Sequence, residues 1–363
     1  MVSTLFEPVS IGRSQLPNRL VMAPMTRNRA TPQGLVTEVT AEYYAQRASA
    51  GLIISESIQP SVIGQGYFLT PGLHNEEQTT AWRQVTDAVH GAGGRIFAQL
   101  THCGRIGHPA LYPDNALPLA PSAVVSGEQL FTPDGMLDHP TPREMTTEDI
   151  ATTITDFTAA ARNAIAAGFD GVELHGANGY LLHQFLADNT NLRTDSYGGS
   201  VANRIRFVIE VVAAVSEAIG ADRTGIRLSP GNPFNHIEEA DPAPLYVDLL
   251  TKLAEQGIAY VHIVEGGDRE LTTKLRAAWP GALILNPHRT PDAFPATVEA
   301  AEEALESGVT DAVSLGALWL ANPDLDARIK AGGPYNTADQ ATFYGGDRAG
   351  YTDYPTLDKV TSA

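Results

Sequence analysis

The chain has 363 residues, of which 43% are hydrophobic and 18% charged, and its formal net charge is -18. This composition excludes a disordered chain, and an acidic balance without clustered Lys and Arg argues against nucleic acid as a partner. The single cysteine, Cys103, excludes an internal disulfide and a cysteine-based zinc site. We therefore expect a cytoplasmic protein, with neither a secretory signal nor a membrane partner.

Short apolar runs of the β type alternate with amphipathic stretches along the chain. The predicted strands are Leu20–Met25, Leu52–Gln59, Arg95–Thr101, Gly171–His175, Thr224–Leu228, Tyr260–Glu265, Ala282–Asn286 and Asp311–Leu315. The predicted helices are Thr40–Ala50, Thr79–Ala92, Asp149–Ala167, Asn203–Ile219, Ala243–Gln256, Pro291–Ser307 and Pro323–Lys330. This α/β alternation predicts one (β/α)8 TIM barrel domain over residues 1–363, preceded by an N-terminal β-hairpin. A doubly wound sheet is the alternative, but no Gly-x-Gly-x-x-Gly follows the first strand.

Two segments break the alternation. Residues Cys103–Met145 are rich in Pro, Gly and Asp, so we expect a long excursion after the third strand that caps the active site. The tail Gly332–Ala363 is also irregular, but its aromatic residues favour docking onto the barrel. Those aromatic residues are Phe343, Tyr344, Tyr351 and Tyr354.

Polar residues gather at the carboxyl ends of the predicted strands, where the loops of such a barrel converge. They are Thr26, Glu56, Ser57, Gln99, His102, His175, Asn178, Arg227, Glu265 and Asn286. One such residue is often only a cap or a turn former. Their coincidence at one face is the stronger signal, and it predicts the active site there.

Residues 175–200 read HGANGYLLHQFLADNTNLRTDSYGGS and carry the most chemistry. Gly176 and Gly179 permit a sharp turn, so His175, Asn178 and Tyr180 can all face the barrel mouth. An imidazole and an amide supply two donors for one oxygen, which stabilises negative charge that develops on a carbonyl. Tyr180 can then supply a proton. Each residue alone also fits a structural role.

Together with other segments of the chain, residues 175–199 resemble the Old Yellow Enzyme family, and the resemblance covers nearly the whole sequence. The segments that carry the resemblance are Asn18-Arg19, Ala23-Pro24-Met25-Thr26-Arg27, Gly66-Tyr67, Pro71-Gly72-Leu73-His74, Gln99-Leu100, residues 175–199, Asn203-Arg204, Arg227-Leu228-Ser229-Pro230, residues 321–325 and Gly350-Tyr351-Thr352-Asp353-Tyr354-Pro355.

The resemblance implies a flavin-dependent ene-reductase that uses NADPH or NADH and acts on small α,β-unsaturated carbonyl compounds (enones), as a monomer or homodimer. Bound FMN would pass hydride to the β-carbon, and Tyr180 would protonate the α-carbon while His175 and Asn178 hold the carbonyl. By the same resemblance, FMN contacts would come from Pro24, Met25, Thr26, Ser57, Gln99 and Arg227. Tyr67 and Tyr351 would line the substrate mouth.

The sequence departs from the family at the phosphate site, which the resemblance places after strands seven and eight. Ala317, after Gly316, stands where the family has an Arg, and Pro287 has no N–H to donate. Either Arg289 or His288 replaces the missing donors, or the site takes a different flavin, the deazaflavin F420. Thr101 stands where relatives often carry a Trp, so we expect a wider substrate pocket.

Three other kinds of protein could have the same fold. An aldolase or a metal-assisted hydrolase would need a strand-end lysine or further metal ligands, which we do not find, and we expect no metal. A flavin-binding protein without alkene turnover leaves the set His175, Asn178 and Tyr180 unexplained.

Overall fold

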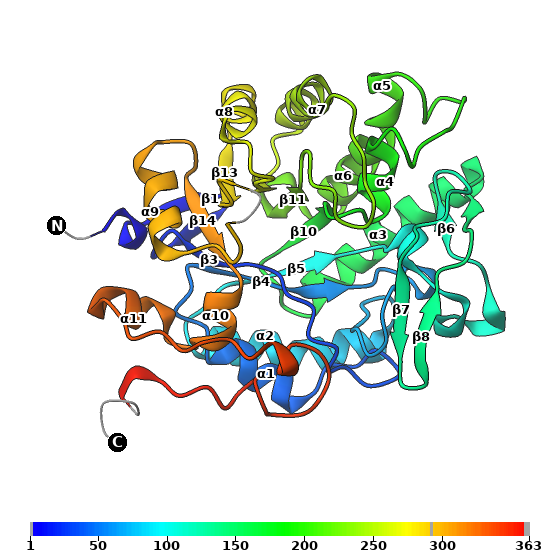
Figure 1. Cartoon of the computed structure of the whole chain (residues 1–363). Coiled ribbons are helices and arrows are strands. Elements are labelled where there is room, and N and C mark those ends of the chain that lie inside the picture. Colours follow the sequence, from blue (N-terminus) through cyan, green and yellow to red (C-terminus); the bar gives the residue numbers. More distant parts are fainter. Residues whose placement is uncertain (1–2, 291–292, 359–363) are drawn as a thin grey trace.

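The computed structural model describes residues 3–290 and 293–358. In it, the predicted strands and helices alternate and form a closed barrel. Within these residues, eight strands pair in parallel into a closed barrel (Figure 1). The strands are β3 (Leu20–Met22), β4 (Leu52–Ile58), β5 (Ile96–Leu100), β10 (Gly171–Gly176), β11 (Thr224–Leu228), β12 (Tyr260–Val264), β13 (Ala282–Asn286) and β14 (Ala312–Leu315). The expected (β/α)8 barrel is confirmed.

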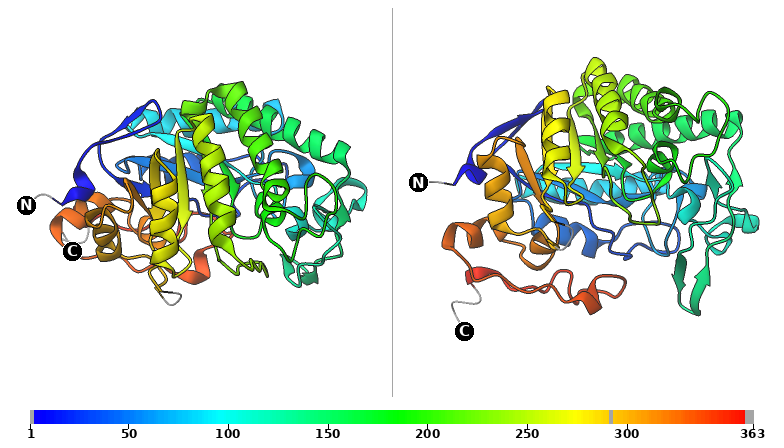
Figure 2. Two further views of the ribbon diagram at one scale, coloured as in Figure 1. Left: turned by 90° about the horizontal axis from the view of Figure 1, so that it is seen from above. Right: turned by 45° about the horizontal axis from the view of Figure 1, so that its top comes forward.

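Helices lie outside the barrel and bury their apolar faces against the strands (Figure 2). The larger ones are α1 (Glu38–Ala45), α2 (Glu76–Gly91), α3 (Thr147–Ala166), α6 (Arg206–Ile219), α7 (Pro242–Gln256), α8 (Arg269–Ala278), α9 (Val298–Glu306) and α11 (Leu325–Ala331). Three short helices follow strands or precede a longer helix: α4 (Leu181–Leu186), α5 (Val201–Arg204) and α10 (Ala317–Ala321). No helix in the described part of the chain is long and apolar enough to cross a membrane.

Capping residues shift several helix boundaries from the predicted ones. The helices expected from Thr40 and Asp149 begin earlier because Thr37 and Thr146 form capping boxes with those same residues. The helix expected over Pro291–Ser307 starts only at Val298, where Thr297 accepts a hydrogen bond from the Ala300 N–H; Pro291 itself lies outside the described residues. The helix expected over Asn203–Ile219 begins at Val201 and is divided at Ile205.

The hairpin of β1 (Val9–Ile11) and β2 (Ser14–Leu16) closes the amino-terminal end of the barrel, as expected for an N-terminal β-hairpin. Ile11 and Leu16 pack with Leu52, Phe97 and other residues of the barrel strands. Outside this cluster, Arg13 and Asp222 form an exposed ion pair of 2.7 Å that ties the hairpin to the chain before β11. The hairpin therefore does not cover the carboxyl ends of the strands, where the predicted active-site residues lie.

The excursion between β5 and α3 is built of short turns, the paired β6 (Leu119–Ala120) and β9 (Arg143–Glu144), and a hairpin of β7 (Gln129–Thr132) and β8 (Gly135–Asp138). The buried Arg105 joins it to the loop after β11, because its Nη2 donates to the carbonyls of Asn235 and His236 at 2.9 and 3.0 Å. Residues Cys103 and Ile106 pack against Tyr67 and Tyr180. The excursion therefore borders the barrel mouth.

The tail is docked, as expected from its aromatic residues. The buried Arg27, just after β3, donates from Nε to the Phe343 carbonyl at 2.9 Å and from Nη2 to the Gly350 carbonyl at 2.8 Å. Arg29 donates to further carbonyls of the same segment. These charge-assisted hydrogen bonds hold the tail against the loop that follows β3.

Candidate active site

Side chains of β4 and β5 form one wall of the barrel mouth. Thr101 Oγ1 donates to Ser57 Oγ at 3.0 Å, and Ser57 Oγ donates to Gln99 Oε1 at 3.2 Å. The strand register places Ser57 beside Gln99, so the two predicted cofactor contacts are neighbours in space. The parallel pairing of the strands creates this arrangement because it brings equivalent positions to one end of the barrel.

His175 lies on β10 beside Arg227 of β11. Its ring is buried, and its Nδ1 has no hydrogen-bond partner among the described residues. Burial, reinforced by the charge of Arg227, holds the pKa of His175 well below its usual value. The imidazole is therefore neutral at pH 7, and its unpartnered nitrogen is a buried polar atom for which a ligand would account.

Asn178 sits in a tight turn directly after β10. Its φ of 56° lies in the left-handed region, and its backbone N–H donates to Ser229 Oγ at 2.8 Å. At the next residue, Gly179, a Cβ would lie 2.6 Å from the Cβ of Asn235, so only glycine fits. Asn235 also donates from Nδ2 to the Asn178 carbonyl at 2.7 Å. The loop after β11 thus fixes the turn that carries Asn178.

Tyr180 follows the same turn, and its ring centroid lies 5.0 Å from that of His175. Its phenol oxygen is 2.9 Å from that of Tyr67, and the two rings are edge-to-face. Burial raises the pKa of Tyr180 above its usual value, so its phenol keeps its proton at neutral pH. The structure therefore brings together the predicted proton donor, one predicted carbonyl ligand and one predicted mouth residue.

A small cavity lies between Tyr67 and the wall of β4 and β5. Its lining residues are Ser57, Gln59, Gly64, Gly66, Tyr67, Thr70, Thr101 and Cys103. Thr101 and Tyr67 both face this cavity. The expectation that the small Thr101 side chain widens the substrate pocket stays a prediction.

Arg227 supplies a buried positive charge beneath the mouth. Its Nη2 donates to Asn286 Oδ1 at 3.3 Å, and Asn286 Nδ2 donates to the Ser314 carbonyl at 2.9 Å. The Nε of Arg227 is buried and has no partner in residues 3–290 or 293–358. A buried guanidinium with an unsatisfied N–H is suited to an anionic or carbonyl group of a ligand.

The predicted contacts Pro24, Met25 and Thr26 form the partly exposed loop directly after β3. Met25 lies beside the chain after β14, because a Cβ on Gly316 would stand 3.5 Å from the Met25 sulfur. Gly316 is the residue before α10, where Ala317 follows with no side-chain donor. The loop after β3 and the turn after β14 are thus adjacent, as a shared cofactor site requires.

The two expected substitutes for the missing phosphate donor are engaged elsewhere. The buried His288 ring stacks on Phe294 with centroids 3.7 Å apart, and its Nδ1 donates to the Ala293 carbonyl at 2.8 Å. The exposed Arg289 forms an ion pair with Glu303 of α9. A contact from Arg289 to a phosphate would first require this ion pair to open.

Tyr351 does not line the mouth, and this prediction is wrong. Its ring is buried and stacks on Tyr43 at a centroid distance of 4.0 Å, with Arg27 and Arg29 against it. Tyr344, seven positions earlier, is instead 69% exposed. Burial is the main cause that raises the pKa of the Tyr67 and Tyr180 phenols, and Tyr344 is among the lesser causes for both. In the sequence, the adjacent aromatic residues Phe343 and Tyr344 before Gly345 are the feature that could have pointed to Tyr344.

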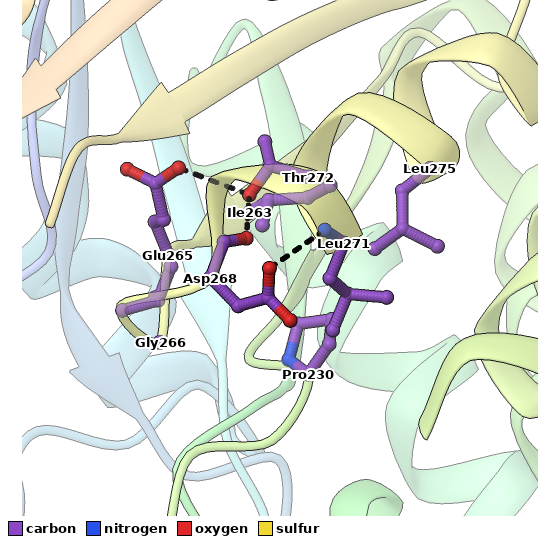
Figure 3. Close-up of a pocket in the computed structure, with 9 residues that line it drawn as sticks. Pro230, Ile263, Glu265, Gly266, Asp268, Leu271, Thr272 and Leu275 are labelled. Atoms are coloured by element: carbon purple, nitrogen blue, oxygen red, sulfur yellow. Dashed lines mark hydrogen bonds between the residues drawn. The ribbon is translucent and has the colours of Figure 1, made fainter. Parts of the chain in front are cut away.

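Some strand-end residues are structural. Figure 3 shows Glu265 beside the start of α8, where Thr272 donates to Glu265 Oε1 at 3.1 Å and the Leu271 N–H donates to Asp268. The other Glu265 oxygen accepts from the His288 N–H at 3.0 Å. Glu265 therefore joins β12, α8 and the loop after β13. His102 is likewise packed inside, and burial lowers its pKa to about 3.

A polar group inside the barrel, below the mouth, was not predicted from the sequence. Glu173 of β10 and His262 of β12 are fully buried and lie 2.9 Å apart. Both sit inside strands and not at their ends, so no local pattern in the sequence singles them out. Across residues 3–290 and 293–358, no group of three or more His, Cys, Asp or Glu is placed to hold a metal ion.

Comparison with known proteins adds to this geometry. The sequence model of the NADH:flavin oxidoreductase / NADH oxidase family matches residues 4–336. A probable flavin mononucleotide-dependent alkene reductase of Leishmania infantum is 43% identical, over 98% of each chain. The 12-oxophytodienoate reductase 7 of Oryza sativa subsp. japonica is 40% identical, over 99% of this chain and 96% of that protein. The solved structure of morphinone reductase in complex with tetrahydroNAD superposes with a TM-score of 0.92 at 41% identity, over 98% of each chain.

Proposed function

Because the chain belongs to the NADH:flavin oxidoreductase / NADH oxidase family, we propose that the barrel mouth reduces the C=C bond of α,β-unsaturated carbonyl compounds with bound FMN. The observation that carries the proposal is the pairing of a neutral His175, whose Nδ1 is unpartnered among the described residues, with the protonated Tyr180. A hydrogen-bond donor and a proton donor thus lie next to each other, with ring centroids 5.0 Å apart.

The residues present fit a flavin. The buried Arg227 has an Nε without a partner in the described structure, and it lies in the same mouth as Ser57 and Gln99. A positive charge there balances negative charge on the pyrimidine side of the ring system. Pro24, Met25 and Thr26 would flank the cofactor, and the turn at Gly316 and Ala317 would receive its phosphate. When bound, FMN supplies a carrier that takes hydride from NADPH or NADH and delivers it to the alkene.

In this proposal, His175 and Asn178 donate hydrogen bonds to the substrate carbonyl, which lowers the energy of the enolate-like charge that develops as the β-carbon gains hydride. The Tyr180 phenol gives its proton to the α-carbon, so one hydride and one proton complete the reduction. Tyr67 holds the Tyr180 hydroxyl by their mutual hydrogen bond. In this proposal Tyr344 lines the mouth in place of Tyr351, which the family resemblance had implied.

The alternative with deazaflavin F420, based on Pro287 and Ala317, gains no support from the comparisons. Relatives named as alkene or oxophytodienoate reductases also favour turnover over flavin binding alone. The buried, single Cys103 is compatible with the cytoplasm as the place of action.

The test starts from the visible spectrum of the purified protein and the identity of its released chromophore. We expect oxidised FMN that bleaches with NADPH or NADH under anaerobic conditions and regains its colour with cyclohexenone. Bleaching without recovery would contradict alkene reduction, and a colourless protein that binds F420 but not FMN would contradict the cofactor.

A further inference from the structure

Glu173 lies at the centre of a buried polar network that takes no part in the proposed hydride and proton transfers. It occupies β10 two residues before His175, and its side chain is fully buried. Its Oε1 accepts from Gln99 Nε2 at 2.8 Å, and its Oε2 accepts from the Tyr260 hydroxyl at 3.1 Å. The same Oε2 lies 2.9 Å from His262 Nδ1. One carboxylate is thus surrounded by donors from β5 and β12.

The hydrogen bonds on both sides run toward this carboxylate. Burial lowers the pKa of His262, so its neutral ring has one proton, which Nδ1 donates to Glu173. His262 Nε2 then accepts from Ser314 Oγ at 2.8 Å. On the other side, Ser57 Oγ donates to Gln99 Oε1. Because donors surround both Glu173 oxygens, the Gln99 amide turns its NH2 end toward the carboxylate.

We propose that Glu173 is a positioning residue that holds the Gln99 amide with Nε2 inward and Oε1 toward the barrel mouth. The inference rests on the proposed function, because it takes Gln99 to contact the flavin. An oxidised isoalloxazine ring has one N–H group, at N3, and its remaining polar atoms on the pyrimidine edge are acceptors. An amide oxygen at the mouth can accept from that N–H, whereas an amide NH2 cannot.

The substitution Glu173→Gln makes the proposal testable. The new amide must accept from Tyr260 or His262, so its NH2 faces Gln99 Nε2. Two donors then oppose each other, and Gln99 relieves the conflict by turning its oxygen inward. The NH2 of Gln99 would then face the flavin. A change at a buried residue thus reverses the polarity of a group at the mouth, although the shape of the site is nearly unchanged.

The experiment is a double-mutant cycle on FMN binding to the apoprotein, measured by quenching of flavin fluorescence. The four proteins are the wild type, Glu173→Gln, Gln99→Met and the double variant Glu173→Gln/Gln99→Met. We expect each single change to weaken FMN binding by about tenfold, and the double variant to match Gln99→Met within about twofold. An equal loss from Glu173→Gln in both backgrounds would show that Glu173 acts on the barrel as a whole and would overturn the proposal.

A reciprocal exchange keeps the test decisive if Glu173→Gln fails to fold. The variant Glu173→Gln/Gln99→Glu retains a hydrogen bond between amide and carboxylate and presents an acceptor at the mouth. We expect it to unfold at nearly the wild-type temperature and to bind FMN more tightly than Gln99→Met does. FMN binding no tighter than that of Gln99→Met would refute the role of amide polarity.

FMN binding and cyclohexenone reduction distinguish a failure of the Glu173 positioning role from a failure of the proposed function. Unchanged FMN affinity in Gln99→Met would show that Gln99 does not contact the flavin, and the positioning role would fail with it. Absence of cyclohexenone reduction by FMN-saturated wild type would reject the proposed reaction, while the binding cycle would still report on Glu173.

Discussion

The phenol oxygens of Tyr67 and Tyr180 lie 2.9 Å apart, although 113 residues separate them in the chain. Their rings meet edge-to-face, with an angle of 89° between the planes. Because burial raises the pKa of both phenols, each remains protonated at neutral pH, and one must donate to the other. This contact joins the loop after β4 to the turn after β10 and gives the proposed proton donor a fixed orientation.

Replacing Tyr180 with Phe removes the proposed acid while the ring remains. We expect alkene reduction to slow by about 100-fold or more, because a positioned general acid typically contributes that much. Reduction of the flavin by nicotinamide does not use this proton and should change by less than about twofold. Stopped-flow absorbance under anaerobic conditions separates the two half-reactions. The control Tyr67→Phe keeps the donor and removes only its hydrogen-bond partner, so we expect a smaller loss there. Alkene reduction at the wild-type rate in Tyr180→Phe would contradict the role of Tyr180 as the acid.

Replacing Thr101 with Trp fills the cavity between the strand wall and Tyr67. We expect the ratio of kcat/KM for a bulky ring-substituted cyclohexenone to that for cyclohexenone to fall by about tenfold, because the indole takes the space of the larger substituent. The control Thr101→Ser keeps the hydroxyl that donates to Ser57 and should leave this ratio unchanged. An unaltered ratio in Thr101→Trp would place the bulky substituent elsewhere.

Replacing Ala317 with Arg introduces a cation beside the turn at Gly316. We expect FMN to bind about tenfold more tightly, as a new charge-assisted hydrogen bond to the phosphate would provide. The control Arg289→Ala should change FMN affinity little, because Arg289 is paired with Glu303. Titration of the apoproteins with FMN, with riboflavin as the ligand without phosphate, checks both. A gain that riboflavin shares would not come from the phosphate.

Glu56 makes stability depend on pH. Burial raises its pKa from 4.5 to about 7, so between these values the folded protein holds a proton that the unfolded chain has released. Its contribution to the free energy of unfolding is therefore full at low pH and is lost as the pH rises through 7. The total loss is roughly 3 kcal/mol.

Thermal unfolding of the apoprotein from pH 5 to pH 8 measures this effect. We expect the midpoint to fall over this range in the wild type and to fall less in Glu56→Gln, which stays neutral throughout. Parallel curves for the two proteins would assign the pH dependence to other groups.

The sequence located all eight barrel strands, since each is a short, mainly apolar run whose residues are largely buried. Helix α8 was not predicted because its sequence RELTTKLRAA has few apolar residues, and only Leu271, Thr272 and Leu275 are buried. The paired strands β7 and β8 inside the excursion were not predicted for a similar reason. Their residues are largely exposed, so no periodicity marks them.

The sequence by itself determined the barrel and its polar end, because strand periodicity and parallel connections bring strand ends to one face. It also identified His175, Tyr180 and Tyr67, which the fold brings together. Only the tertiary structure showed that Tyr351 is buried and Tyr344 exposed, since both are aromatic residues of an irregular tail whose path depends on Arg27 and Arg29. Likewise, only the structure revealed Glu173 below Gln99. A buried carboxylate inside a strand has no local signature, and its effect depends on donors from strands far away in the chain.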